Sequence, residues 1–171
     1  MDGDITIESG GSITGNVRAT ASDFTVDYGG EGNVDYRGYQ YLSGPGAGGD
    51  GYTQGSGGGA YGGGGGDGLY STGVGGSVYG STTEPTDLGS SGGAYSSSYP
   101  GGSGGGAIKL AVTGTTTING GISASGQNYV GAFSGGGSGG SIWLDTNVLT
   151  GTGTMTAIGG LGYTSSGGGG G

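Results

Sequence analysis

The chain has 171 residues, of which 55 are glycine, and twelve acidic against three basic side chains give a formal net charge of −9. It contains no cysteine and no histidine, which excludes disulfides, thiolate or imidazole zinc sites and catalytic sets built on either residue. The shortage of cations makes nucleic acid and anionic membrane surfaces poor partners. No run of about 18 apolar residues predicts a membrane span.

The N-terminal segment, residues 1–42, is predicted to form short β-strands. Ile5 and Ile7, and later Phe24 and Val26, alternate with polar residues, a period of two that is typical of half-buried strands. Glycine interrupts every window long enough to hold a helix, so no helix is expected.

Residues 43–106 form a glycine-rich insertion with two interpretations. Gly/Ser-rich composition is typical of a disordered linker, but extended polyglycine II strands could also lie side by side. Shorter glycine runs at 131–140 and 159–171 leave from equivalent positions of the flanking sequence, which favours the second interpretation. Tyrosine rings are expected to cover this glycine surface: Tyr52, Tyr61, Tyr70, Tyr79, Tyr95, Tyr99, Tyr129 and Tyr163.

The C-terminal part, residues 107–171, contains one unit written twice. The copies GGAIKLAVTGTTTINGGISASG (105–126) and GGSIWLDTNVLTGTGTMTAIG (139–159) align at a spacing of 34, and then of 33 after a one-residue slip. Internal repetition of this kind is typical of solenoids. The predicted fold class is therefore all-β: short stacked β-solenoid coils (107–126 and 141–159), with the glycine-rich excursions packed as a polyglycine II layer. The inner face is expected to hold Ile108, Leu110, Val112, Ile142, Leu144 and Val148, and to continue with Ile118, Ile122, Ala124, Leu149, Met155 and Ala157.

The repeat, together with SGPGAGGDG (43–51) and YGSTTEPTDLGSSGG (79–93), resembles the glycine-rich repeats of large secreted or cell-surface, adhesin-like proteins of bacteria. The resemblance covers most of the chain from about residue 34 onward. It implies a surface or matrix role and supplies no catalytic residues. In that family the final glycine run usually leads into another strand, whereas this sequence stops at Gly171, which suggests a fragment or a closing strand from another molecule.

No residue set predicts an enzyme, a cofactor or a metal site. Asp23 and Asp27 are the best carboxylate pair, but solvated acids that keep the chain soluble are the simpler interpretation. A G-x-G-x-x-G match at Gly44, Gly46 and Gly49 carries no information at this glycine content.

The first functional hypothesis is a structural, self-associating extracellular protein, either a filament subunit or a segment of a cell-surface adhesin. The expected partner is another copy, joined head to tail, because open strand edges template further strands. We expect Ile5 and Ile7 to insert against the coil that holds Ile142 and Leu144.

Two alternatives place function on an exposed surface. One is a receptor- or glycan-binding tip of a viral or phage fibre, in which tyrosines and Trp143 would contact a glycan or a cell surface. The other is ice binding through an outward threonine row, although threonine is also an ordinary strand residue on a solvated face. The row consists of Thr150, Thr152, Thr154 and Thr156.

Overall fold

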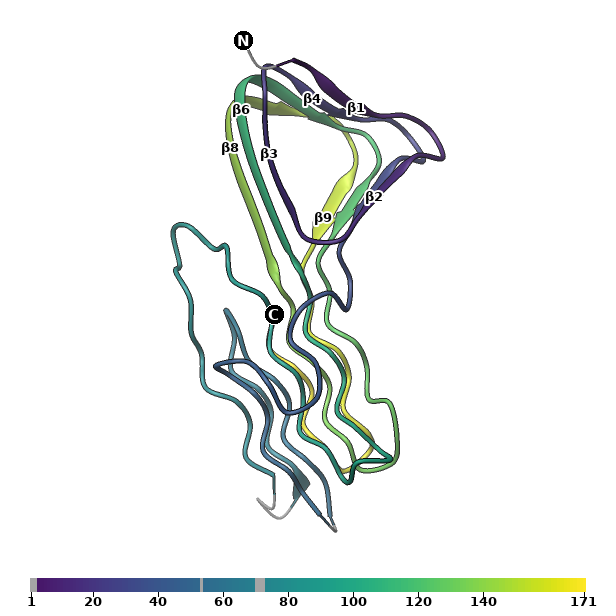
Figure 1. Ribbon diagram of the computed structural model, residues 1–171, viewed down its shortest axis with the longest axis vertical. Coiled ribbons are helices and arrows are strands. Elements are labelled where there is room, and N and C mark those ends of the chain that lie inside the picture. The colour runs from purple at the N-terminus through teal and green to yellow at the C-terminus, as the bar shows by residue number, and fades with distance from the viewer. Residues whose placement is uncertain (1–2, 53, 70–72) are drawn as a thin grey trace.

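The computed structural model describes residues 3–52, 54–69 and 73–171. Figure 1 shows an elongated molecule with two regions: the strands curl around one end, and glycine-rich segments run side by side to the other. None of the described residues lies in a helix that is long and apolar enough to cross a membrane.

The strands form two parallel sheets. Sheet A has five strands in the order β1-β4-β6-β3, with β8 also paired to β6, and sheet B has the order β2-β5-β7-β9. Sheet A contains β1 (Ile5–Ile7), β3 (Val17–Ala21), β4 (Phe24–Val26), β6 (Ala107–Ile118) and β8 (Ser141–Thr150). Sheet B contains β2 (Ser12–Thr14), β5 (Glu31–Asn33), β7 (Gly121–Ser123) and β9 (Thr154–Thr156).

A bend in the long strands lets sheet A cover two sides of the apolar core. The register between β6 and β8 shifts between Val112 and Thr115. At this corner the Asp23 carboxylate accepts a hydrogen bond from the Thr115 N–H at 2.6 Å. β3 pairs with the part of β6 before the corner and β4 with the part after it, so sheet B can close the third side (Figure 1).

The core lies between these sheets and consists of alternate residues of their strands and, at Val34 and Ala124, of the residue that follows a strand. Parallel pairing stacks like positions on one another, so each inward position becomes a column of apolar side chains. The buried members are Ile7, Phe24, Val26, Val34, Ile108, Leu110, Val112, Ile118, Ile122 and Ala124.

The predicted fold class is wrong. The strands form a curled half-barrel of two parallel sheets with no regular solenoid, strands make up 28% of the chain, and the all-β description holds only in part. The reason lies in the spacing of paired strands, which a solenoid keeps constant. Ile5 pairs with Phe24, 19 residues on, whereas Val17 pairs with Ile108, 91 residues on. Among the strands that the structure describes, the spacing of 34 occurs only between β6 and β8.

The alignment of the two copies is nevertheless confirmed. Ile108 pairs with Ile142 at the spacing of 34, and Ile122 pairs with Met155 at the spacing of 33. The one-residue slip in the sequence is the register shift at the corner of sheet A. It also moves Val148 out of the expected inner face: this side chain pairs with Thr115 and is 52% exposed.

The glycine-rich region joins chain segments that are distant in sequence through their backbones. Gly57 donates a hydrogen bond to the Gly49 carbonyl, and Gly93 donates to the Gly57 carbonyl, at 2.9 and 2.8 Å. Gly135 in turn donates to Gly93 at 3.0 Å. Such close approach requires glycine, because a Cβ on Gly135 would lie 2.0 Å from the Gly57 carbonyl oxygen.

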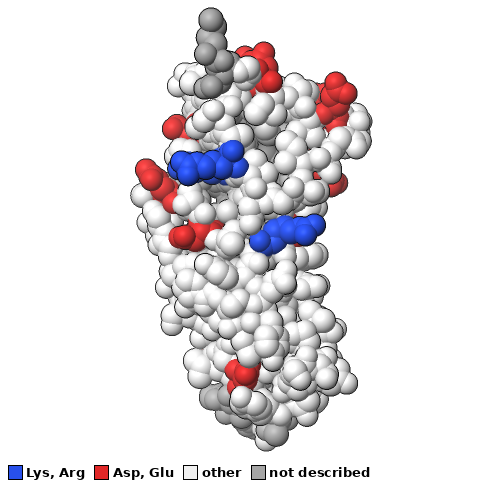
Figure 2. Space-filling view, viewed as in Figure 1, with Lys and Arg blue, Asp and Glu red and all other residues white. Residues whose placement is uncertain are grey.

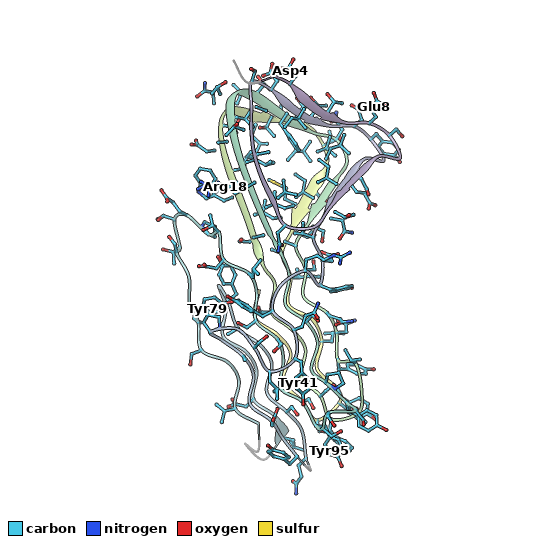
Figure 3. The ribbon with its side chains drawn as sticks, viewed as in Figure 1. Asp4, Glu8, Arg18, Tyr41, Tyr79 and Tyr95 are labelled. Carbon is cyan, nitrogen blue, oxygen red and sulfur yellow. The ribbon has the colours of Figure 1, made fainter. Side chains whose placement is uncertain are left out.

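Aromatic side chains pack within this region in two groups. Tyr61, which is buried, contacts Tyr79 edge-on at 5.1 Å between ring centroids. The second group joins three segments near the far tip, where Figure 3 labels Tyr95. Its rings are Tyr95, Tyr99, Tyr129, Phe133 and Tyr163. Of the tyrosines expected to cover the glycine surface, Tyr70 lies outside the described residues.

Burial changes the ionisation of one of these tyrosines strongly. Desolvation raises the pKa of Tyr79 to about 12, against a lowering by its hydrogen bond with Ser90. The Tyr79 hydroxyl accepts this bond from Ser90 Oγ at 2.9 Å and donates to the Leu88 carbonyl. Folding therefore favours the neutral, protonated form of the Tyr79 side chain.

Candidate assembly surfaces

The stacked strands end in open edges on opposite sides of the molecule. Along the described chain, β1, β2 and β3 each pair on one side only, and we call their free sides the N-terminal edge. In the same way β8 pairs only with β6 and β9 only with β7 among the named strands, and their free sides form the C-terminal edge. Open edges offer backbone N–H and C=O groups to a further strand.

The C-terminal edge is also apolar. In β8 the first six residues are buried or half-buried apart from Asp145, whereas the last four are all exposed, and every residue of β9 is exposed. Leu149 is 51% exposed and Met155 is 43% exposed, although both continue columns that are buried elsewhere. A soluble monomer rarely leaves core positions open in this way, and such patches commonly mark contact surfaces.

The first part of β8 is partly covered by another segment of the chain. Ser141 is buried and its hydroxyl donates a hydrogen bond to the Asp87 carbonyl at 2.9 Å. Pro85 and Ile142 line the same hollow beside this strand. A proline near an edge removes a hydrogen-bond donor and discourages strand addition. The open part of the C-terminal edge is therefore the end of β8 together with β9.

The four residues expected to join copies lie in different columns. Ile5 stacks on Phe24 and Ile7 stacks on Val26, and both columns continue into the second part of β6. Ile142 and Leu144 instead extend the columns of Val17 and Ala19 through the first part of β6. The four residues thus lie on opposite sides of the corner in sheet A.

Trp143 already has a partner within the chain. The Lys109 ammonium lies 4.2 Å from the centre of the indole ring, a cation–π contact. The two residues are paired in the ladder, and Arg18 stands next to Lys109 on the other side. Figure 2 shows how few basic side chains this acidic surface carries; Figure 3 labels Arg18 on it.

The predicted threonine row does not lie on one face. Thr150 ends β8 in sheet A, and the chain then turns at Gly151, whose φ is +112°. Thr154 and Thr156 belong to sheet B, and with Thr152 they line a groove on its outer face. The turn therefore separates Thr150 from the other three.

This outer groove has a volume of about 450 Å³. Gly121 lines it and leaves open space, because no heavy atom lies within 4 Å of where its Cβ would stand. Tyr28, which is 85% exposed, stands at one side, and Glu31 and Asn119 add a carboxylate and an amide. The other lining side chains include hydroxyls of Ser123, Thr152, Thr154 and Thr156.

Sequence reasoning assigned Leu149 and Met155 to the inner surface and missed their exposure. Their apolar character in an alternating pattern correctly indicates an inward column. It cannot indicate that β8 and β9 are the last strands of their sheets, because the residues after them return to the glycine-rich region. Ile13, in β2, closes the opposite end of one column in the same way.

No group of three or more acidic side chains in the described parts of the chain is placed to hold a metal ion. No protein-family model, no curated protein sequence and no solved structure matches this chain.

Proposed function

We propose that this chain is a structural, non-catalytic extracellular protein that associates with copies of itself, as a filament subunit or a segment of a cell-surface adhesin. The proposal combines the acidic, cysteine-free, glycine-rich composition with the resemblance to bacterial surface repeats. Copies join head to tail: the N-terminal edge of one copy meets the C-terminal edge of another, which is a heterologous contact.

The observation that carries this proposal is the pair of open edges. Both sheets stop at each end with strands whose outer sides face no other described strand, and the C-terminal edge exposes Leu149 and Met155. A second copy can cover these side chains and continue both ladders at once. Heterologous contacts of this kind produce a filament when successive copies do not close into a ring.

The test is negative-stain electron microscopy across a concentration series, together with sedimentation velocity. Thin regular fibres that grow with concentration are the expected result. Since each copy carries a net charge of −9, added salt should promote assembly by screening the repulsion between copies. Uniform monomers at every concentration and salt level would contradict the proposal.

Thr6→Pro tests the N-terminal edge while keeping Ile7, which is part of the core. Ile5 and Ile7 direct their backbone groups toward β4, so Thr6 between them faces the open side. Proline at this position removes one N–H from the N-terminal edge and leaves the pairing with β4. We expect soluble, folded monomers and few fibres, with circular dichroism as the check on folding.

A second candidate function is glycan binding, which the groove on the outer face of sheet B favours. An exposed tyrosine ring can pack against a sugar ring, and hydroxyl, amide and carboxylate groups pair with sugar hydroxyls. Binding of neutral oligosaccharides on a glycan array, weakened by Tyr28→Ala and unchanged by Tyr52→Ala, would support this function. Tyr52 is the matched control because it is also highly exposed, at 72%, and lies outside the groove.

A further inference from the structure

We infer that the joint between copies pairs the end of β8 with β1, and β9 with β2, in the register that the ladders already have within one copy. This inference rests on the proposed self-association. It identifies the occupant of the C-terminal edge as the N-terminal edge of a second copy, and it names the residues that meet.

The register in sheet B follows from three successive strand pairs. Ser12 pairs with Glu31, Glu31 with Gly121, and Gly121 with Thr154. In the inferred joint, the next residue in this column is Ser12 of the following copy. The neighbouring inward column runs from Ile13 through Gly32 and Ile122 to Met155, so Ile13 of the following copy covers Met155, and the outward column places Thr14 on Thr156.

The register in sheet A is obtained in the same way. Ile5 pairs with Phe24, Phe24 with Thr116, and Thr116 with Leu149. The half-exposed Leu149 is therefore covered by Ile5 of the following copy. The adjacent outward column ends at Thr150, which meets Thr6. The two half-exposed residues of the inward columns, Leu149 and Met155, thus each receive an isoleucine.

The backbone groups of sheet B point in the directions that this register requires. The Glu31 N–H donates to the Gly11 carbonyl, so Ser12 and Thr14 face the open side of β2. The Thr154 N–H donates to the Gly120 carbonyl and the Thr156 carbonyl accepts from Ala124, so Met155 faces the open side of β9.

These directions pair across the joint. The Met155 N–H can donate to the Ser12 carbonyl of the following copy, and the Thr14 N–H of that copy can donate to the Met155 carbonyl. A slip by one residue would lose this pairing and turn every side chain to the other face.

The remaining surfaces explain why the joint excludes the first part of β8. The segment that contains Pro85 and Asp87 lies against this part. Within one copy, β1 is separated from β6 by β4, whereas β3 pairs with β6 directly. At the N-terminal edge of the following copy, β3 therefore lies one strand further from the joint than β1. The first part of β8 and the outer side of β3 therefore do not meet. No charged residue stands at either end of the five columns that meet at the joint.

The absence of cysteine from the chain makes disulfide trapping a direct test of the register. In the double variant Ser12→Cys/Thr154→Cys, the two thiols lie on outward positions of paired parallel strands, about 5 Å apart between Cα atoms, within the range of a disulfide. Mild oxidation of assembled protein should give a ladder of dimers, trimers and larger species on a non-reducing gel, and reduction should remove it. Each single variant can give dimers at most.

The matched control is Ser12→Cys/Asp145→Cys, which places the second thiol on an exposed position in the first part of β8. Fibres with a ladder from this control and none from Ser12→Cys/Thr154→Cys would overturn the register while leaving self-association intact. The absence of fibres in the unmodified protein would instead overturn the proposed function, so the two failures are distinguishable.

A second experiment removes the apolar contact without disturbing the monomer. Met155→Asp should abolish fibres because the carboxylate would be buried against Ile13 of the following copy. Val74→Asp, an exposed position in the glycine-rich region, should leave them unchanged. Normal fibres from folded Met155→Asp protein would contradict the inference.

Discussion

The sheet region and the glycine-rich region are both held by hydrogen bonds between neighbouring backbones. They differ in what packs in their interiors: side chains in the first region and the backbone itself in the second. In the sheet region, apolar side chains such as Ile108 and Ile122 fill a core between two sheets. In the glycine-rich region, backbones approach until no Cβ fits, as at Gly135. The first region therefore depends on the size of its side chains, and the second depends on their absence.

The largest expected effect comes from the core of the sheet region. Ile122 is 2% exposed, so Ile122→Ala removes buried methyl groups and leaves a cavity, at a cost of about 3 kcal/mol in the free energy of unfolding. Denaturant titration followed by circular dichroism measures this loss. Met155→Ala, in the same column but exposed, should cost far less in the monomer.

The reverse substitution tests the glycine-rich region, where adding a methyl group should destabilise. Gly135→Ala should cost about 2 kcal/mol, because the new methyl group must displace the Gly57 backbone. Gly64→Ala is the matched control: its Cβ would meet only a Val78 methyl group at 3.9 Å. Equal stability of the two variants, measured by denaturant titration, would show that the glycine-rich region tolerates side chains and does not differ from the sheet region in this respect.

A smaller effect is expected where a polar side chain shapes the sheet region. Asp23→Ala removes the acceptor of the Thr115 N–H at the corner of sheet A, which should cost about 1 kcal/mol. Hydrogen exchange should show faster exchange of the Thr115 amide with little change in the glycine-rich region. Faster exchange throughout the molecule would mean that the two regions unfold as one unit.

The smallest effect at neutral pH belongs to the glycine-rich region, where Tyr79 influences stability only at high pH. Tyr79 has a pKa of about 12 in the folded state against an ordinary value of 10.0. Its contribution to stability is fully present below pH 10 and is lost as the pH rises toward 12, because the unfolded chain ionises first. Tyr79→Phe should flatten the decline of the unfolding free energy over this pH range, as measured by denaturant titration at a series of pH values.

The local features of the fold can be predicted from the sequence, and the long-range features cannot. Alternation predicts the inward positions Ile108 and Leu110, and the slip between the two copies coincides with the corner of sheet A. The sequence contains no sign that Val17 pairs with Ile108 across the long insertion. The sequence separation between the strands of one pair does not determine the separation in another pair. This pairing is what replaces a regular solenoid with two curled sheets.

The sequence predicts that an open strand edge joins copies, but it does not predict which residues lie at that edge. The position of Ile5 in an N-terminal strand indicates an open edge. Its place in a different column from Ile142 follows from the corner in sheet A, which the sequence does not reveal. Trp143, which sequence reasoning placed at a contact surface, is engaged by Lys109. Whether Met155 is core or surface depends on whether another strand pairs with β9, and the alternating pattern holds no information about that.

The four-strand ladder of sheet B gives an assembled filament a definite period. Strands in a sheet are spaced by about 4.8 Å, so a joint that continues the ladder repeats the subunit every 19 Å or so along the axis. Aligned fibres should therefore diffract X-rays with a strong 4.8 Å meridional reflection and a weaker series indexing on the longer repeat. The acidic surface and the outer groove would recur at the same interval, so that one filament presents many identical sites in line.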